Sequence, residues 1–185
     1  MNHLGKENSF SFQRTIHALN EGLKLIIRGG IIMKVRIATV EDIQALHQLH
    51  FSLNCHRHTL QPTNFQGRSV DEEWIYENIV SSDKDYLVLE IKDEVVGMAL
   101  LEKKEGHTVN GSVRYRYLYL RDFMIDSSHC LQTQGHELFK GIRRYGKKNF
   151  LSYIQLNELI NDEERLKFFE KEQLIVTQQT LKSAI

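Results

Sequence analysis

The segment SSHCLQTQGHELF, residues 127–139, has the residue types of a helix start that binds an anion. Its first half is polar, and its second half begins an apolar pattern with helical spacing. The first turn of a helix has unpaired backbone N–H groups and the positive end of the helix dipole, and both attract phosphate. Glycines let such a turn approach a phosphate closely, and this turn has only Gly135. Two interpretations stay open: a phosphate-binding turn with few glycines, or an ordinary helix start with Thr133 or Gln134 at its edge.

A second group of reactive side chains lies in HQLHFSLNCHRH, residues 47–58. Imidazole and thiolate groups bind zinc, and His47 and His50 are three positions apart on an expected helix. That helix has no pair of histidines four positions apart, and the loop after it has no defined ligand spacing. We therefore predict no metal site, and we expect these side chains in a substrate loop or on the solvated surface.

Composition limits the class of protein. The chain has 185 residues, enough for one domain with a sizeable core, and its 24 basic and 24 acidic side chains cancel. Without a basic excess we expect neither a nucleic acid nor an anionic membrane as partner. No apolar run of about 18 residues is present, so we expect no transmembrane helix. Cys55 and Cys130 form neither a CxxC motif nor a disulfide framework, so we expect a reducing, cytoplasmic location.

The first 32 residues share no pattern with the rest of the chain, and MKVRIATVEDI, starting at Met33, resembles a natural protein start. Residues 28–30, Arg-Gly-Gly, can be encoded by a purine-rich bacterial ribosome-binding sequence. We therefore divide the chain into an N-terminal extension, 1–32, which one hypothesis treats as translated leader, and a domain, 33–185. The alternative is a real amphipathic helix in the extension, with Phe12, Ile16, Leu19 and Leu23 on one side.

From Met33 onward, short strands alternate with helices. Strands are predicted over residues 34–38, 85–92, 94–103, 114–126, 150–157 and 173–180. Helices are predicted over residues 39–53, 69–82, from the 127–139 segment to about 145, and 162–171. Along strand 114–126 the alternation puts Tyr115, Tyr117, Tyr119, Phe123 and Ile125 on one face, and Leu118, Leu120, Asp122 and Met124 on the other. This order predicts an α/β (α+β) fold with one central mixed sheet flanked by helices.

Four stretches, in this order, resemble the GNAT superfamily of N-acetyltransferases. VRIATVEDIQAL is similar to the opening strand and helix of that family, and EVVGMALL, with Gly97, is similar to its central hairpin strand. YLRDFMID resembles the strand that precedes the cofactor loop. IQLNELINDEERLKFFEKEQL resembles the family pattern N-x-x-A-x-x-F-Y-E-K-x-G-F. The resemblance covers Met33 to about Val176 and implies a mostly antiparallel mixed sheet.

The resemblance implies acetyl-CoA as co-substrate and no metal. Its pyrophosphate motif is (Q/R)-x-x-G-x-(G/A). In register, Cys130 replaces the Arg or Gln, Leu131 and Thr133 replace two glycines, and Gly135 matches. A second register, from Gln132 to Gly135, would turn the apolar residues of the following helix to solvent, so we reject it. The implied cofactor-binding residues are Phe123, Met124, Ile125, Gln132, Thr133, Gln134, Gly135, His136, Asn161 and Phe169.

Acetyl transfer to an amine needs a general base, because the amine is protonated at neutral pH. Asp122 is the candidate base, and the alternative is a structural ion pair of Asp122 with Arg121 or Arg143. A backbone N–H near Met124 would bond the thioester carbonyl oxygen, as the resemblance implies.

Two family positions differ in the 162–171 helix. Phe169 stands where the family has a tyrosine that protonates the leaving thiolate, and Tyr145 and Tyr153 are candidate substitutes. Arg165 stands where the family has a small alanine, and it would either crowd the pantetheine arm or reach a phosphate.

The function that follows is an N-acetyltransferase that moves an acetyl group from acetyl-CoA to a primary amine of a small molecule or protein. The amine would attack directly in a ternary complex, and the 54–68 loop would shape its pocket. The alternative is a catalytically weak or inactive GNAT-like module that binds a ligand or a partner. A homodimer formed through the tyrosine-rich strand or the C-terminal strand is compatible with both.

Overall fold

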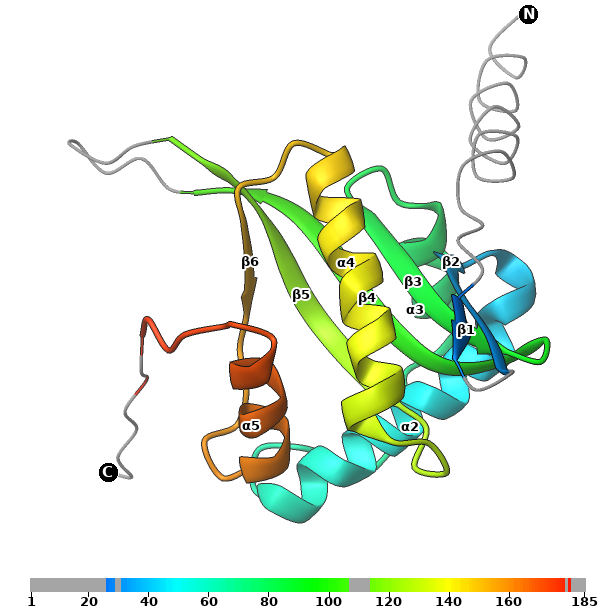
Figure 1. Cartoon of the computed structure of the whole chain (residues 1–185). Coiled ribbons are helices and arrows are strands. Elements are labelled where there is room, and N and C mark those ends of the chain that lie inside the picture. Colours follow the sequence, from blue (N-terminus) through cyan, green and yellow to red (C-terminus); the bar gives the residue numbers. More distant parts are fainter. Residues whose placement is uncertain (1–25, 29–30, 107–113, 179, 181–185) are drawn as a thin grey trace, which may run out of the picture.

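The computed structural model describes residues 26–28, 31–106, 114–178 and 180 (Figure 1). Its strands are β1 (Ile26–Arg28), β2 (Ile31–Ile37), β3 (Lys84–Ile91), β4 (Glu94–Glu105), β5 (Arg116–Ile125) and β6 (Tyr153–Leu156). Its α-helices are α2 (Ile43–Leu60), α3 (Glu72–Val80), α4 (His136–Lys148) and α5 (Glu163–Lys171), with a 3-10 turn η1 (Val40–Asp42) and a π-helical turn η2 (Leu131–Gly135). No helix in these ranges is long and apolar enough to cross a membrane.

The strands form one sheet in the order β1-β2-β3-β4-β5-β6. Every neighbouring pair is antiparallel except β5 and β6, which run parallel. The mixed, mostly antiparallel sheet predicted from the sequence is therefore confirmed. The parallel ladder ends at the pair Leu120 and Leu156, while β5 continues to Ile125. Beyond that pair β5 and the segment that follows β6 separate, and the candidate site lies between them.

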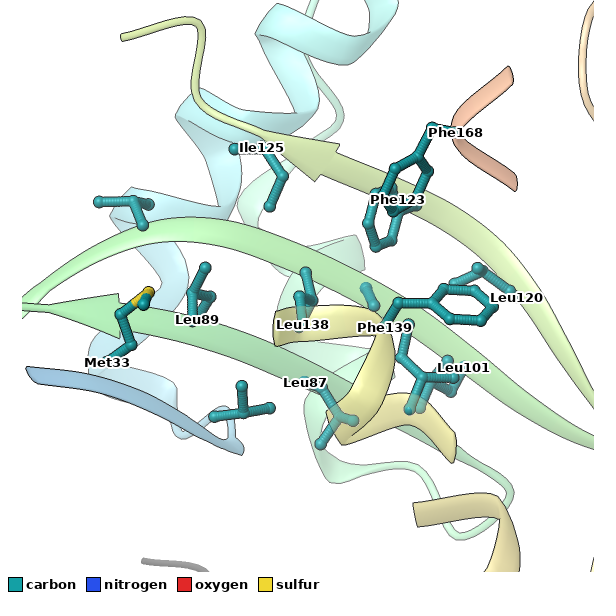
Figure 2. Packing of buried hydrophobic residues seen from close by; sticks show 14 of the residues in the cluster. Met33, Leu87, Leu89, Leu101, Leu120, Phe123, Ile125, Leu138, Phe139 and Phe168 are labelled. Carbon is teal, nitrogen blue, oxygen red and sulfur yellow. The ribbon is translucent and has the colours of Figure 1, made fainter. Parts of the chain in front are cut away.

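Helices cover both faces of the sheet (Figure 1). On the face of α4 and α5 the core contains a cluster of aromatic rings, and Figure 2 shows Phe123, Phe139 and Phe168 together with strand leucines. On the other face, α2 buries Leu46, Leu49, His50 and Leu53, which have the i, i+3, i+4, i+7 spacing of one side of a helix. The sheet thus separates two independent packing layers.

A β-bulge in β5 corrects the predicted strand faces. Leu100 pairs with Asp122 while Leu101 pairs with Leu120, so the register leaves Arg121 as an extra residue. The bulge reverses the alternation: Leu118, Leu120, Phe123 and Ile125 all belong to the core on the α4 face. Met124 packs on the α2 face. The prediction that Phe123 shares a face with the tyrosines is therefore wrong.

Several predicted boundaries also change. Helix α2 continues to Leu60, through a polar stretch predicted as a loop, because His56 and Arg57 bond to acidic partners on other elements. Helix α3 begins at Glu72 rather than near Ser69. The strand predicted over 173–180 is wrong for its described part, since residues 174–178 have no regular structure.

At the N-terminal side, strand β1 pairs with β2, and β2 begins at Ile31, two residues before Met33. The amphipathic helix considered for the extension lies outside the described residues. The division at Met33 stays a prediction.

Candidate active site

A cleft lies where the parallel strands β5 and β6 separate. Its volume is about 270 Å³, and its wall comes from α2, the α2–α3 loop, β5 and the segment after β6. The lining residues are Arg57, Phe65, Tyr119, Arg121, Asp122, Asn157, Glu158 and Leu159. The carboxyl ends of adjacent parallel strands whose chains diverge are a common position for ligand sites. The fold therefore places polar and charged groups at this opening.

Asp122, the predicted general base, lies in this cleft on the α2 side of the sheet. Its side chain is buried, and Arg57 Nη1 donates a 2.8 Å hydrogen bond to its Oδ1. Arg121 Nε lies 4.0 Å from Oδ2, on the same side chain. The sequence suggested Arg121 or Arg143 as the structural partner, and the principal partner is Arg57. One carboxylate oxygen thus serves the ion pair with Arg57, and the other faces Arg121 at the longer distance.

A buried histidine–tyrosine pair lies behind Asp122. His50 Nε2 and the Tyr86 hydroxyl are 2.8 Å apart, and Trp74 packs edge-on against the His50 ring. Burial lowers the pKa of His50 to about 4. Burial, with the charge of Asp122 adding to it, raises the pKa of Tyr86. The pair is therefore neutral at neutral pH and places uncharged groups in the core near the Asp122–Arg57 ion pair.

Arg165 of α5 fills the opening between β5 and β6 from the opposite side. Its side chain is buried, its Nη1 donates to the Phe123 carbonyl at 3.0 Å, and its Nε donates to Glu158 Oε2 at 2.8 Å. The guanidinium lies against the rings of Phe123 and Phe169. Glu158 also lines the cleft of Asp122. The Arg165–Glu158 pair therefore separates the α4/α5 side of the sheet from the cleft of Asp122.

The turn before α4 is a compact π-helical turn, and Cys130 caps it. The N–H groups of Thr133 and Gln134 donate to the Cys130 carbonyl, and the Gln134 side chain accepts from Cys130 N at 3.1 Å. Hydrogen bonds from the Thr133 side chain and from the N–H groups of Thr133 and Gln132 lower the pKa of the Cys130 thiol. The N–H groups of residues 132–134, which a pyrophosphate would use, are thus directed at Cys130, and the His136 N–H bonds the Thr133 carbonyl.

Gly135 is buried at the contact between α4 and α5. A Cβ at this position would lie 2.9 Å from Leu131 Cδ1 and 3.2 Å from the ring of Phe168. Close packing against Leu131 and Phe168 therefore favours a glycine here whether or not phosphate binds. Phe169 is buried in the same aromatic core, 5.7 Å from Phe123 between ring centroids. Ile125, at the end of β5, is buried against Gly97.

The remaining predicted cofactor residues bond to neighbouring elements. Gln132 accepts a 3.0 Å hydrogen bond from Lys171, and His136 Nδ1 lies 2.6 Å from Glu172, so both join the α4 start to the end of α5. Asn161 instead donates to the Leu60 carbonyl at the end of α2. The structure brings the residues of 132–136 together with Phe123 and Phe169 around α5, and it places Asn161 with α2.

Neither substitute acid lies at this opening. The hydroxyl of Tyr145 donates to Asp85, and Tyr145 lies ten residues, roughly 15 Å of helix, beyond Gly135. Tyr153 starts β6, three residues or roughly 10 Å of strand before the ladder ends at Leu156. Phe169 therefore has no tyrosine from these two candidates to replace it.

A second cleft, of about 470 Å³, adjoins the first, and the side chain of Phe65 lines both. Most of the residues that line it are polar or charged. Besides Phe65 they are Asn54, Asn64, Gln66, Arg68, Ser69, Val70, Asp71 and Trp74. The expectation that the 54–68 segment shapes a pocket fits this geometry, although its first part is helical.

The histidines of residues 47–58 point to separate partners. His50 bonds Tyr86, His56 lies 2.5 Å from Asp162, and His58 Nδ1 lies 2.7 Å from the Phe65 carbonyl. Among the residues that the structure describes, no three His, Cys, Asp or Glu side chains gather as a metal site would need.

Sequence reasoning missed the contacts of Arg57 and Glu158. Arg57 follows Leu53 by four positions, so continuing the apolar face of the helix by one turn would have placed it over the sheet. Glu158 carries no comparable signal, because its partner Arg165 is recognised only through the fold.

Solved structures share this fold. The BH1408 protein from Bacillus halodurans, in a tetramutant form, has a TM-score of 0.77 at 17% identity, covering 82% of this chain and 99% of that one. The aminoglycoside N-acetyltransferase AAC(6')-Iy in complex with CoA has a TM-score of 0.64 at 12% identity, covering 86% and 99%. An aminoglycoside acetyltransferase from an uncultured soil metagenomic sample, in complex with sisomicin, has a TM-score of 0.62 at 15% identity, covering 83% of this chain and 95% of that one. No family model and no curated protein match the chain. The chain has the GNAT-like fold that its motifs predict.

Proposed function

We propose that this protein is an acetyl-CoA-dependent N-acetyltransferase acting on a primary amine in the Asp122 cleft. The observation that carries the proposal is a charged cleft at the separation of β5 and β6, in a fold shared with acetyltransferases. The acceptor nitrogen would bond to the acetyl carbon while the C–S bond breaks and its electron pair leaves with sulfur. Asp122 would take one proton from the bound ammonium before the attack, and the second proton would pass from nitrogen to the leaving thiolate. The thiolate would leave without help from a tyrosine, because Phe169 supplies no proton.

Acetyl-CoA fits these residues only if Arg165 moves. The backbone of β5 after the bulge would hold the pantetheine arm, and its Phe123 carbonyl now accepts from Arg165. The turn η2 before α4 would hold the pyrophosphate, and the N–H groups of Thr133 and Gln134 in this turn now bond the Cys130 carbonyl. Rotation of the Arg165 side chain would free the carbonyl and open the path to Asp122. We place this reaction in the cytoplasm, where the two free cysteines stay reduced.

The second candidate is a GNAT-like module that binds a ligand or partner without turnover. The observation in its favour is the same buried Arg165–Glu158 pair, together with the phenylalanine at position 169. If the pair never opens, the acetyl group cannot reach the acceptor cleft.

Calorimetric titration of acetyl-CoA separates the two candidates. We expect binding tighter than about 100 μM for the natural chain, within the usual range for enzyme substrates. Arg165→Met should bind about tenfold more tightly, because no guanidinium then competes for the Phe123 carbonyl. Lys167→Ala, an exposed change on the same helix, is the control and should match the natural chain.

Turnover with an amine panel, measured as thiol release, completes the experiment. Asp122→Asn should lower turnover while leaving acetyl-CoA affinity unchanged. A millimolar or undetectable response to acetyl-CoA in both the natural chain and Arg165→Met would favour the module. Weaker binding by Arg165→Met would instead show that Arg165 contacts the cofactor.

A further inference from the structure

The acceptor cleft presents two guanidinium groups to a ligand as well as the carboxylate of Asp122. Arg57 and Arg121 both line it, with side chains 21% and 44% exposed. Each bonds a protein carboxylate through Nη1: Arg57 bonds Asp122 and Arg121 bonds Glu102. A guanidinium has five N–H donors, so these ion pairs leave donors of both residues for a ligand.

Both guanidinium groups are held in place before any ligand arrives. Arg57 stacks over Phe65 at 5.8 Å from the ring centroid, and Arg121 stacks over Trp74 at 5.6 Å. The bond to Glu102 raises the pKa of Arg121, so that group stays charged. Fixed, planar guanidinium groups bind carboxylates well, because two N–H donors meet two oxygens.

The charges of the cleft alternate over a short distance. Arg121 Nε lies 4.0 Å from Asp122 Oδ2, and the remaining acid, Glu158, is neutralised by Arg165. A complementary ligand must therefore carry its own positive and negative groups equally close together. An amine and a carboxylate on the same or adjacent carbons satisfy this spacing.

We propose that the acceptor is a small zwitterion of the α-amino acid type, with its amine at Asp122 and its carboxylate at Arg121 and Arg57. This deepens, and rests on, the proposed N-acetyltransferase function. The 270 Å³ of the cleft is at the small end for ligand pockets and suits a molecule of that size. A polar side chain would extend past Phe65 into the second cleft, between Asn54 and Gln66.

A polycationic acceptor such as an aminoglycoside fits this lining less well. Its several ammonium groups would lie next to Arg57 and Arg121, and like charges at such distances repel. The neighbours that act on aminoglycosides share the fold, and the lining of this cleft points to a different acceptor.

The test measures acceptor binding without acetyl-CoA, by ligand-observed NMR with pools of the proteinogenic amino acids. For the tightest binder, its amide removes the carboxylate charge and its N-acetyl form removes the amine charge. We expect each derivative to bind about tenfold or more weakly. Arg121→Gln should reduce affinity for the amino acid by at least about fivefold, and should leave affinity for the amide unchanged. Arg144→Gln, an exposed change on α4, should have no effect.

The proposal is overturned if no pool binds at millimolar concentration, if the amide binds as well as the amino acid, or if an aminoglycoside binds more tightly than every amino acid. If Arg121→Gln loses its folded circular dichroism, Arg121→Lys replaces it and should retain only part of the affinity. Because acetyl-CoA is absent, failure of the acyltransferase function leaves this test intact. Thiol release with no preference for amino acids would overturn the acceptor class alone.

Discussion

His50 is a titratable side chain that the fold buries next to the cleft. The residue is 2% exposed, its ring contacts Tyr86 and Trp74, and burial lowers its pKa to about 4. In the unfolded chain the pKa is about 6.5, so the unfolded state binds more protons between these values. The contribution of neutral His50 to the free energy of unfolding should therefore be fully present above pH 6.5 and should be lost as the pH falls toward 4.

We predict that the free energy of unfolding decreases by about 2 kcal/mol between pH 7.5 and pH 5 because of His50 alone. Urea denaturation of the natural chain and of His50→Gln at both pH values measures this, since glutamine keeps a hydrogen-bonding side chain without titrating. The difference between the two pH values should shrink in His50→Gln by that amount. An equal pH dependence in both proteins would show that His50 is protonated without cost.

Residue types in the sequence predicted that Asp122 belongs to the site, but they gave an incomplete reason for the glycine at position 135. Asp122 was identified from its strand position, and the structure places it in the cleft, although its base role stays a prediction. Gly135 was identified as the one surviving phosphate-loop glycine, yet a glycine there is also favoured by packing against Phe168. A motif match cannot distinguish these reasons, because both favour a position without a Cβ.

At the scale of elements, periodicity predicted the four α-helices and the strands β2 to β6, but it predicted neither β1 nor how β5 is phased. The sequence YLYLRDFMID gives no sign of the bulge at Arg121, because the part before it and the part after it each fit the regular alternation of a strand. Only the pairing with β4 reveals the extra residue. The strand predicted at 173–180 failed for a related reason: β propensity is high there, but residues 174–178 have no strand to pair with in the described chain.

The contact between α4 and α5 makes a prediction at this scale. Gly135→Ala would place a methyl group 2.9 Å from Leu131 Cδ1 and 3.2 Å from the Phe168 ring, so the Leu131 side chain must turn away and the Phe168 ring must move by a few tenths of an ångström. We expect a loss of about 1–3 kcal/mol in unfolding free energy by urea denaturation. Gly146→Ala, in α4, which Gly135 caps, is the control, because its methyl group would meet only Leu118 at 3.7 Å. That change should be neutral or stabilise by up to about 1 kcal/mol.

A loss in Gly135→Ala no larger than in Gly146→Ala would show that α5 yields easily at this contact. The packing reason for Gly135 would then be wrong, and phosphate approach would be the better explanation. The two alanine variants therefore also decide which of the two interpretations of the 127–139 segment explains Gly135.

For the whole molecule, the sheet order follows from the chain order, which is why the fold was predictable from one sequence. Five strands that succeed one another as antiparallel neighbours require only short connections or a covering helix, and α4 makes the single parallel crossover to β6. The order of the strands does not show whether the gap between β5 and β6 is open or closed by a side chain. Whether Arg165 closes it depends on side-chain contacts from three separate segments.

The start of the domain is a prediction at the same scale. A chain that begins at Met33 keeps the buried side chains of Met33 and Val35 and their pairing with β3, and of the described structure it loses β1 and two residues of β2. We expect it to fold with a cooperative thermal transition about 2–6 °C below that of the full chain, since one short edge pairing is lost. A chain that begins at Ile37 removes most of β2 from the core and should not fold. Circular dichroism melts of the three chains measure this, and failure of the Met33 chain to fold would show that residues 1–32 belong to the domain.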